Sequence, residues 1–354
     1  MCGRLKTFHS VLAMVLLLAG GGSPLADDGT IRPGPTLAQN PAVPRGVPDR
    51  RGVYTFINEN DLYAIENSDR HYTNGVRLAW LSADDEVPEW GKQLGDALPF
   101  LNPEARRRIG WAIGHNLYTP QDKATRERVA DDRPYAAFLY VGLALQSETE
   151  TRLDTLELDI GVVGPAALGK PIQNNYHRLI GAKKAYGWSH QLKNEPGVAL
   201  AWERKWRFLD EQPPDTLGWD VIPHLAGSIG NVSTYAGAGA TFRFGDDLIS
   251  DFGPPRIRPA LPGSSSYRPR DSFGWYLFAG AEGRAVLRDV FLDGNTFTDS
   301  HSVSKKPLVA DFQAGFALLF ERFRLSYTQV MRTREFDGQD RPDFFGSVSI
   351  SARF

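Results

Sequence analysis

The last nine residues of the chain read Gly346-Ser347-Val348-Ser349-Ile350-Ser351-Ala352-Arg353-Phe354. Apolar residues occupy every second position, and serines with one arginine occupy the positions between them. Side chains of a β-strand point alternately to opposite faces, so this period of two predicts a strand with one apolar face and one polar face. The stretch therefore indicates a protein built from sheets whose two faces meet different environments.

The same alternation recurs upstream. In 153–162, apolar residues alternate with Thr155, Glu157 and Asp159, and in 235–244 alanines and phenylalanines alternate with glycines and polar residues. The pattern predicts twelve strands, at 53–60, 72–82, 109–119, 135–147, 151–162, 197–208, 219–230, 232–244, 273–290, 307–320, 322–333 and 344–354. Short helices are expected only at 88–98 and 170–182, and the Pro- and Gly-rich 245–272 is interpreted as an irregular connection.

Alternation alone does not separate a soluble β-sandwich from a membrane barrel. Three features favour an antiparallel, up-and-down transmembrane β-barrel in the bacterial outer membrane. The segments are about ten residues long, as tilted spanning strands require. The terminal Phe354 resembles the C-terminal signal of outer-membrane proteins. Tryptophans lie within or near strand ends, as an interfacial girdle requires, at Trp80, Trp111, Trp202, Trp206 and Trp275.

The N-terminal segment predicts export. Arg4 and Lys6 precede the apolar run 11–19, which is too short to span a bilayer, so 1–26 is interpreted as a removable signal peptide. Residues 27–52 lack periodicity and are expected to be a flexible lead-in to the barrel domain at 53–354. The formal charge of −2 becomes −4 without the signal, which leaves 38 basic and 42 acidic residues, so nucleic-acid binding is not indicated.

Strand parity gathers the polar clusters at one rim. In a meander with an even number of strands and both ends in the periplasm, the first, third and fifth connections emerge on the outside. These are 61–71, 120–134 and 163–196. Their polar residues include Asn58-Glu59-Asn60-Asp61, Tyr72-Thr73-Asn74-Gly75, Lys123, Asp131-Asp132-Arg133-Pro134-Tyr135 and Gln173-Asn174-Asn175-Tyr176-His177. Scattered positions thus become one candidate site.

These residues also carry a family resemblance. The segments are Asn60-Asp61, Tyr72-Thr73-x-Gly75, Asp132-Arg133, Gly161-Val162-Val163-Gly164-Pro165 and Gln173-Asn174-x-x-His177-Arg178-x-Ile180-Gly181-Ala182. Together and in this order they resemble the outer-membrane lipid A 3′-O-deacylase family, from residue 53 to the end. The resemblance implies a twelve-stranded barrel, a Ca²⁺ requirement and hydrolysis of the 3′ ester of lipid A. It also implies outer-membrane lipids and the barrel assembly machinery as partners.

The chemistry assigned to each residue follows from its type. The imidazole of His177 can take a proton from the attacking water. Asp61 and Asn60 carry the oxygen ligands that calcium prefers, and the cation would polarise the ester carbonyl. Thr73 and Lys123 match family site positions and would donate hydrogen bonds to the substrate or the oxyanion.

The connection 163–196 carries a local charge of +4, so its cations are expected to bind the phosphates of an anionic glycolipid. The three assigned to the substrate are Arg178, Lys183 and Lys184. Lys183 departs from the family pattern, because an aligned member has an acidic residue there, and its tyrosine two positions later falls at Ala185. This departure bears most directly on the expected calcium requirement.

Plainer interpretations remain open for several residues. Asn60 and Asp61 also suit an Asx-type turn, Thr73 an ordinary strand position, and Lys123 a solvated loop. For the whole protein the alternatives are an outer-membrane phospholipase and a non-catalytic barrel, either a small pore or a surface protein. A pore predicts that Thr155, Glu157 and Asp159 line open water, whereas an enzyme predicts that they pack into a polar network.

Overall fold

The computed structural model describes residues 48–64, 71–180, 184–209, 216–257, 265–270 and 272–354. These residues form thirteen strands: β1 (Val53–Asn60), β2 (His71–Leu81), β3 (Arg106–Thr119), β4 (Ala136–Glu148), β5 (Arg152–Val163), β6 (Glu195–Trp206), β7 (Phe208–Leu209), β8 (Gly218–Gly230), β9 (Ser233–Gly245), β10 (Phe273–Asp289), β11 (Leu308–Phe320), β12 (Phe323–Arg332) and β13 (Asp343–Arg353). The short β7 continues β6 beyond Arg207, since both pair with β8. Counting β6 and β7 as one strand, the barrel wall therefore has twelve strands.

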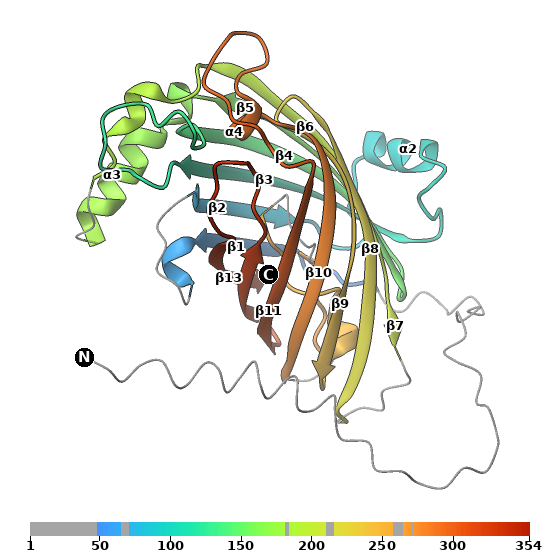
Figure 1. The fold of residues 1–354 in the computed structure, drawn as a ribbon. Coiled ribbons are helices and arrows are strands. Elements are labelled where there is room, and N and C mark those ends of the chain that lie inside the picture. Colours follow the sequence, from blue (N-terminus) through green and yellow to red (C-terminus); the bar gives the residue numbers. More distant parts are fainter. Residues whose placement is uncertain (1–47, 65–70, 181–183, 210–215, 258–264, 271) are drawn as a thin grey trace, which may run out of the picture. The chain divides into compact units, whose positions relative to one another are not determined.

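The sheet closes on itself as a barrel (Figure 1). Consecutive strands pair antiparallel, β1 pairs with β13, and β6 pairs with β8. Closure removes the free edges that an open sheet would leave. The predicted strands agree with the observed ones to within about three residues at every end. The fold class expected from the sequence, an antiparallel β-barrel of twelve strands, is confirmed.

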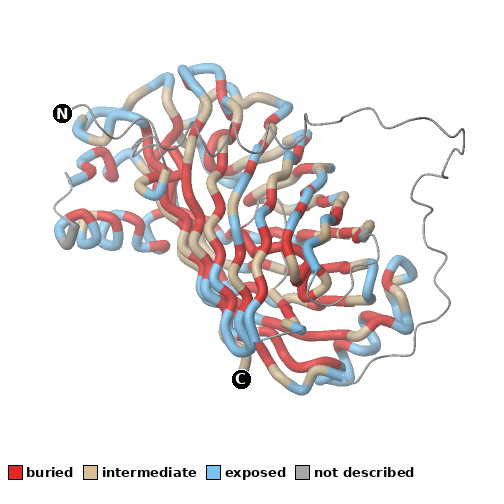
Figure 2. Tube along the Cα trace, turned by 90° about the horizontal axis from the view of Figure 1, so that it is seen from below, coloured by how far each residue is buried: buried red, intermediate tan, exposed pale blue. Residues whose placement is uncertain are grey.

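Buried and exposed residues alternate along the strands (Figure 2), and many of the buried ones are polar, which is the reverse of a soluble sandwich. In β13 the serines Ser347, Ser349 and Ser351 are at most 2% exposed, whereas Ile350 is 46% exposed. Ser351 hydrogen-bonds Thr55 at 3.0 Å across the β1–β13 pair, inside the barrel. The polar face thus points into the lumen and the apolar face outward, which is the arrangement of a barrel surrounded by lipid.

Paired charges fill the lumen. Asp311 lies between two guanidinium groups, at 3.1 Å from Arg284 and 2.8 Å from Arg332. Thr155, Glu157 and Asp159 are all buried, and Glu157 accepts a hydrogen bond from Arg77. Buried ions need partners of opposite charge, and this interior supplies them. The lumen is therefore a packed polar network at these positions, as the enzyme alternative predicted and the open-pore alternative did not.

The connection between β9 and β10 folds back into this interior. Asp251 accepts hydrogen bonds from Arg243 at 2.6 Å and from Arg324 at 2.7 Å. Arg256 reaches Glu59 of β1 at 2.9 Å. The described parts of 245–272 thus pack inside the barrel, as the irregular connection expected from the sequence.

The barrel has two unlike ends. The terminal rim holds Val53 and Arg353, the paired ends of β1 and β13, and carries α2 (Glu89–Ala97) and η4 (Leu248–Ser250). The loop rim carries η1 (Asp61–Tyr63), η2 (Pro165–Ala167), α3 (Gly169–Ile180), η3 (Gly187–His190) and α4 (Val290–Asp293). In Figure 1, α3 lies beyond one end of β3–β5 and α2 beyond the other. Both helices expected from the sequence are present. No helix in the described part of the chain has the length and apolar character needed to cross a membrane.

Candidate active site

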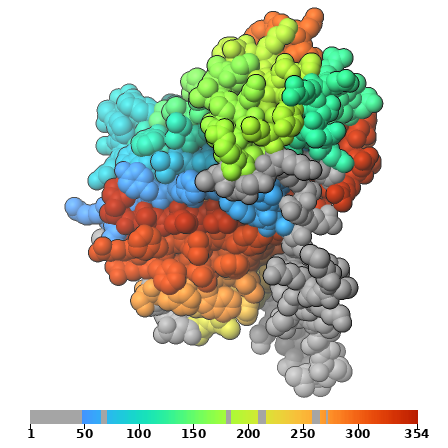
Figure 3. Space-filling view, turned by 90° about the vertical axis from the view of Figure 1, so that its left-hand side faces the viewer, coloured from blue at the N-terminus to red at the C-terminus, as the bar shows by residue number. Residues whose placement is uncertain are grey.

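The connection between β5 and β6 lies on the outer surface of the wall, not over the lumen. Outward side chains of three neighbouring strands, Leu117, Ala137 and Val162, pack against it. Its own contribution to this apolar cluster is Ala167, Ala185 and Trp188. Figure 3 looks onto this face, where the yellow-green surface of the connection lies beside the teal-green surface of 120–135. A site beneath α3 is therefore next to the lipid that surrounds the barrel.

Helical spacing places His177 on the face of α3 that is turned inward. Gln173 and His177 are four residues apart, so they lie on one face, and they are 2% and 3% exposed. Tyr176 and Arg178, on other faces, are exposed. The candidate base is thus shielded from bulk water although its helix lies on the surface.

Two contacts hold α3 in place. The indole Nε1 of Trp188 donates a 2.7 Å hydrogen bond to Oε1 of Gln173. The amide of Asn174 pairs with the backbone of Ala185, accepting from its N–H at 3.0 Å and donating to its carbonyl at 3.3 Å. Gln173 and Asn174, which precede His177 in the sequence, therefore have a structural role. They tie the helix to the returning chain.

His115 attaches the start of the connection to the wall. Its Nε2 is 2.7 Å from the carbonyl oxygen of Ala167, which can only accept, so His115 carries its proton on Nε2. His115 follows Ile113 on the outward face of β3. This histidine fastens the loop that presents His177, a role that the sequence did not suggest.

Thr73 lies at an irregularity in β2. Tyr72 pairs with Tyr118 and Asn74 with Leu117, so Thr73 is an extra residue in the ladder between β2 and β3. Its hydroxyl shares a 2.7 Å hydrogen bond with that of Thr119, and both residues are buried. A bulge redirects a side chain, and bulges are common beside active sites. Thr73 is therefore not an ordinary strand position.

Asn60 and Asp61 lie where β1 passes into η1. The Oδ1 of Asn60 accepts a 2.8 Å hydrogen bond from the N–H of Leu62, which is the turn-forming role left open by the sequence. Asp61 is 1% exposed. The pKa of Tyr63 is raised by burial and also by Tyr176 of α3. The first and fifth connections both lie at the loop rim.

Lys123 lies in the third connection, against the fifth. Its carbonyl oxygen accepts a 3.0 Å hydrogen bond from the N–H of Tyr186 and a 3.4 Å bond from the hydroxyl of Tyr135. The backbone of Lys123 is thus fixed beside the connection that carries α3. Parity correctly predicted that these connections share a rim.

A buried histidine anchors the base of 120–135. His71 Nδ1 is 2.8 Å from both carboxylate oxygens of Asp343, and its Nε2 is 3.5 Å from Asp132. Asp132 also accepts from the N–H of Gln121 at 2.7 Å. Burial raises the pKa of Asp132, but the hydrogen bond and charge of His71 together with the N–H groups of Gln121 and Arg133 outweigh burial, so the pKa lies below its usual value. Asp132 therefore holds the start of the third connection against β2.

The cations of the fifth connection face outward. Lys170, Arg178, Lys184 and Lys193 are exposed, while Lys183 lies outside the described residues. Glu195, its single acidic residue, is buried and accepts a 2.8 Å hydrogen bond from the N–H of Thr296. The exposed charge of the described part of this connection is therefore positive.

The case for a calcium site at η1 depends on which oxygen atoms lie there. The Asp61 carboxylate is buried, and an amide oxygen and strand-end carbonyls lie next to it in the chain. These are the hard oxygen ligands that Ca²⁺ takes, about six to eight in number, so water or substrate would complete the shell. Within the described residues, no cluster of three or more His, Cys, Asp or Glu side chains suited to a metal is present. The oxygen atoms at and beside Asp61 are therefore of the type that binds Ca²⁺.

Comparison with known proteins identifies relatives. A model of the family described as outer membrane protein LpxR matches residues 15–354. The structure of LpxR from Salmonella typhimurium superposes with a TM-score of 0.69 at 24% identity, covering 85% of this chain and 100% of that one. The beta domain of the Bordetella autotransporter BrkA gives a TM-score of 0.40 at 9% identity, covering 86% and 98%. No curated protein matched the chain.

Proposed function

The chain belongs to the LpxR family of outer membrane proteins, and on that premise we propose that it is a lipid A 3′-O-deacylase. The reaction is hydrolysis of the ester that joins the acyloxyacyl chain to the 3′ position of lipid A. The barrel lies in the outer membrane, and even strand number with both barrel ends in the periplasm directs the loop rim to the outside. Its assembly would use the barrel assembly machinery.

The observation that carries the proposal is the position of His177. It is buried on the face of α3 that also carries Gln173, and the partner of Gln173, Trp188, packs on the outer surface of the wall. A lipid in the outer leaflet can bring an ester at the level of its sugar to this place without leaving the membrane. Neither a pore nor a soluble hydrolase predicts a buried histidine at this position.

Each residue has a part in water attack. The imidazole of His177 takes a proton from water as the oxygen adds to the ester carbonyl, and later returns it to the departing 3′ oxygen. The products are a free carboxylic acid and a 3′ hydroxyl group. Hydroxyl and ammonium groups of Thr73 and Lys123 would donate to the oxyanion, and such donors contribute about 3–4 kcal/mol each to the rate.

Calcium, when bound by Asp61 and oxygen atoms near Asn60, would supply a positive charge at the ester carbonyl. Arg178, Lys184 and, outside the described residues, Lys183 would bind the phosphates of the substrate. Their exposure on the face of the connection supports this part of the proposal. An outer-membrane phospholipase stays the runner-up, because it would attack the same class of bond in the same leaflet.

Mass spectrometry of lipid A from cells producing the wild type or His177→Ala tests the proposal. The wild type should remove the 3′ acyloxyacyl group, and the variant should leave lipid A intact while reaching the outer membrane in equal amount. Glycerophospholipid chains released in place of lipid A chains would identify a phospholipase. No change with either protein would indicate a non-catalytic barrel.

A further inference from the structure

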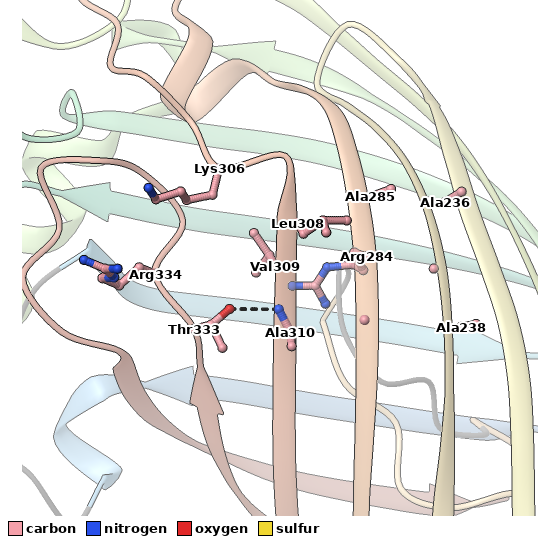
Figure 4. Close-up of a pocket in the computed structure, with 12 residues that line it drawn as sticks. Ala236, Ala238, Arg284, Ala285, Lys306, Leu308, Val309, Ala310, Thr333 and Arg334 are labelled. Atoms are coloured by element: carbon pink, nitrogen blue, oxygen red, sulfur yellow. Dashed lines mark hydrogen bonds between the residues drawn. The ribbon is translucent and has the colours of Figure 1, made fainter.

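A groove lies across β9, β10 and β11 at the loop-rim end of the barrel (Figure 4). Its volume is about 830 Å³. In the order of strands around the wall, β10 is about halfway round from β3 and β4, where α3 packs. The groove is therefore separate from the candidate active site.

Small side chains form its floor. The register sets Ala238, Gly283 and Ala310 side by side on three adjacent strands, and Ala236 beside Ala285 in the next row. A Cβ atom built on Gly283 would meet nothing within 4 Å. One row towards the terminal rim, β11 already carries the large Phe312 at the outward position. Phe312 thus bounds the groove on β11, whereas β9 and β10 still carry the small Ala240 and Ala281 in that row.

The depression opens towards the membrane. Ala236, Ala238 and Ala285 are exposed, whereas Arg284, between the outward positions of β10, points into the lumen and bonds Asp311. A hollow on the lipid-facing surface of a membrane barrel is filled by lipid, since water there would leave apolar groups hydrated. Its occupant is therefore an acyl chain.

Two cations lie at the end of the groove nearest the loop rim. Figure 4 shows Lys306 and Arg334 on one side, with Ala236 and Ala238 on the other. The two basic residues come from connections that are bonded together, because the N–H of Lys306 donates to the carbonyl of Glu335 at 2.7 Å. Lys306 also pairs with Asp337, but both side chains are substantially exposed, and such pairs exchange partners readily.

We infer that this groove binds a second, non-catalytic molecule of the phosphorylated glycolipid of the outer leaflet. One acyl chain lies over Ala238, Gly283 and Ala310, and a phosphate contacts Lys306 and Arg334. The leaflet follows from the outward direction of the loop rim, and the anionic headgroup from the two cations. The inference uses the orientation given under the proposed function but not the hydrolysis.

Native mass spectrometry of the detergent-extracted protein with bisphosphorylated lipid A tests the groove. All proteins carry His177→Ala so that the lipid is not consumed. Gly283→Leu fills open space, and the double change Lys306→Glu with Arg334→Glu reverses the headgroup charge. Ala314→Leu is the matched control, because it adds the same side chain to an outward position of β11 that does not line the groove.

Parental and Ala314→Leu proteins should show a two-lipid species. Gly283→Leu and the double variant should each weaken it on the order of tenfold. Equal two-lipid binding by all four proteins overturns the inference, as does equal displacement by zwitterionic phospholipid. The difference in gel mobility between heated and unheated samples checks that each variant is folded. With His177 restored, Gly283→Leu should deacylate at the wild-type rate, so failure of the groove and failure of the proposed reaction are distinguishable.

Discussion

The Trp188 indole donates its hydrogen bond to Gln173, one helical turn before His177. The bond is 2.7 Å long, and both residues are at most 2% exposed. It joins the helix that carries the candidate base to the chain that returns to the barrel. The orientation of His177 therefore depends on a contact that takes no part in the chemistry.

Trp188→Phe should lower deacylation about tenfold while leaving the barrel folded. The ring still packs on Tyr135, at 5.0 Å between centroids, but Gln173 loses its donor. An unsatisfied buried acceptor costs about 1–3 kcal/mol, and α3 can relieve that cost by shifting. The rate with purified lipid A measures the effect. Unchanged turnover would show that the contact does not position His177.

Thr73→Val should reduce turnover by about two to three orders of magnitude, whereas Thr73→Ser should keep most of it. Valine preserves the shape of the threonine and removes the hydroxyl that lies 2.7 Å from Thr119. The comparison is made on kcat at saturating substrate. Equal loss in both variants would indicate a packing role at the bulge and not a hydrogen bond to the reacting group.

Much of this architecture is predictable because it depends on local periodicity. Ser347, Ser349 and Ser351 reveal a strand from their spacing alone, and strand parity then brings 61–71, 120–134 and 163–196 to one rim. Alternation alone does not give the direction of the polar face, since a sandwich and a barrel share the pattern, although strand length, the tryptophans and Phe354 favour the barrel. Burial of the serines decided it.

Contacts between distant residues could not be predicted in this way. His71 and Asp343 are separated by 272 positions, and their bond requires β2, β1 and β13 to be placed in register. Periodicity also cannot reveal the bulge at Thr73, which depends on how β2 pairs with β3, or the contact of His115 with Ala167, which depends on how the fifth connection meets β3.

Charge reversal at Lys184, combined with reversal at Lys183 outside the described residues, should raise KM for bisphosphorylated lipid A about tenfold. The value of kcat should change little, because the cations hold phosphate rather than the ester. The difference should shrink at high salt. Steady-state kinetics at two ionic strengths measures both effects. An unchanged KM would remove these lysines from the substrate site.

The ionised carboxylate of Glu335 is expected to stabilise the loop rim, and this stabilisation should be lost in acid. It accepts a 3.1 Å hydrogen bond from the fully buried Arg133. Burial raises its pKa, but Arg332 and Arg133 outweigh that effect, so the pKa lies below the usual 4.5. A group with a depressed pKa in the folded state stabilises it above the unfolded value, and this contribution disappears as the pH falls through the folded value.

Glu335→Gln should therefore unfold at a lower temperature than the wild type at neutral pH, by about 3–5 kcal/mol in stability. The gap should stay constant down to about pH 5 and close in stronger acid. Thermal melts followed by circular dichroism across this range test it. A gap that persists in strong acid would mean that the charge of Glu335 is not the cause.

The most direct measurement is hydrolysis of purified lipid A in ¹⁸O-labelled water by the wild type and His177→Ala. Water attack predicts one ¹⁸O in the carboxyl group of the released acyloxyacyl acid, an unlabelled 3′ hydroxyl on the sugar, and no release by the variant. Label on the sugar, or equal release by His177→Ala, would contradict the assignment of His177 as the base that activates water.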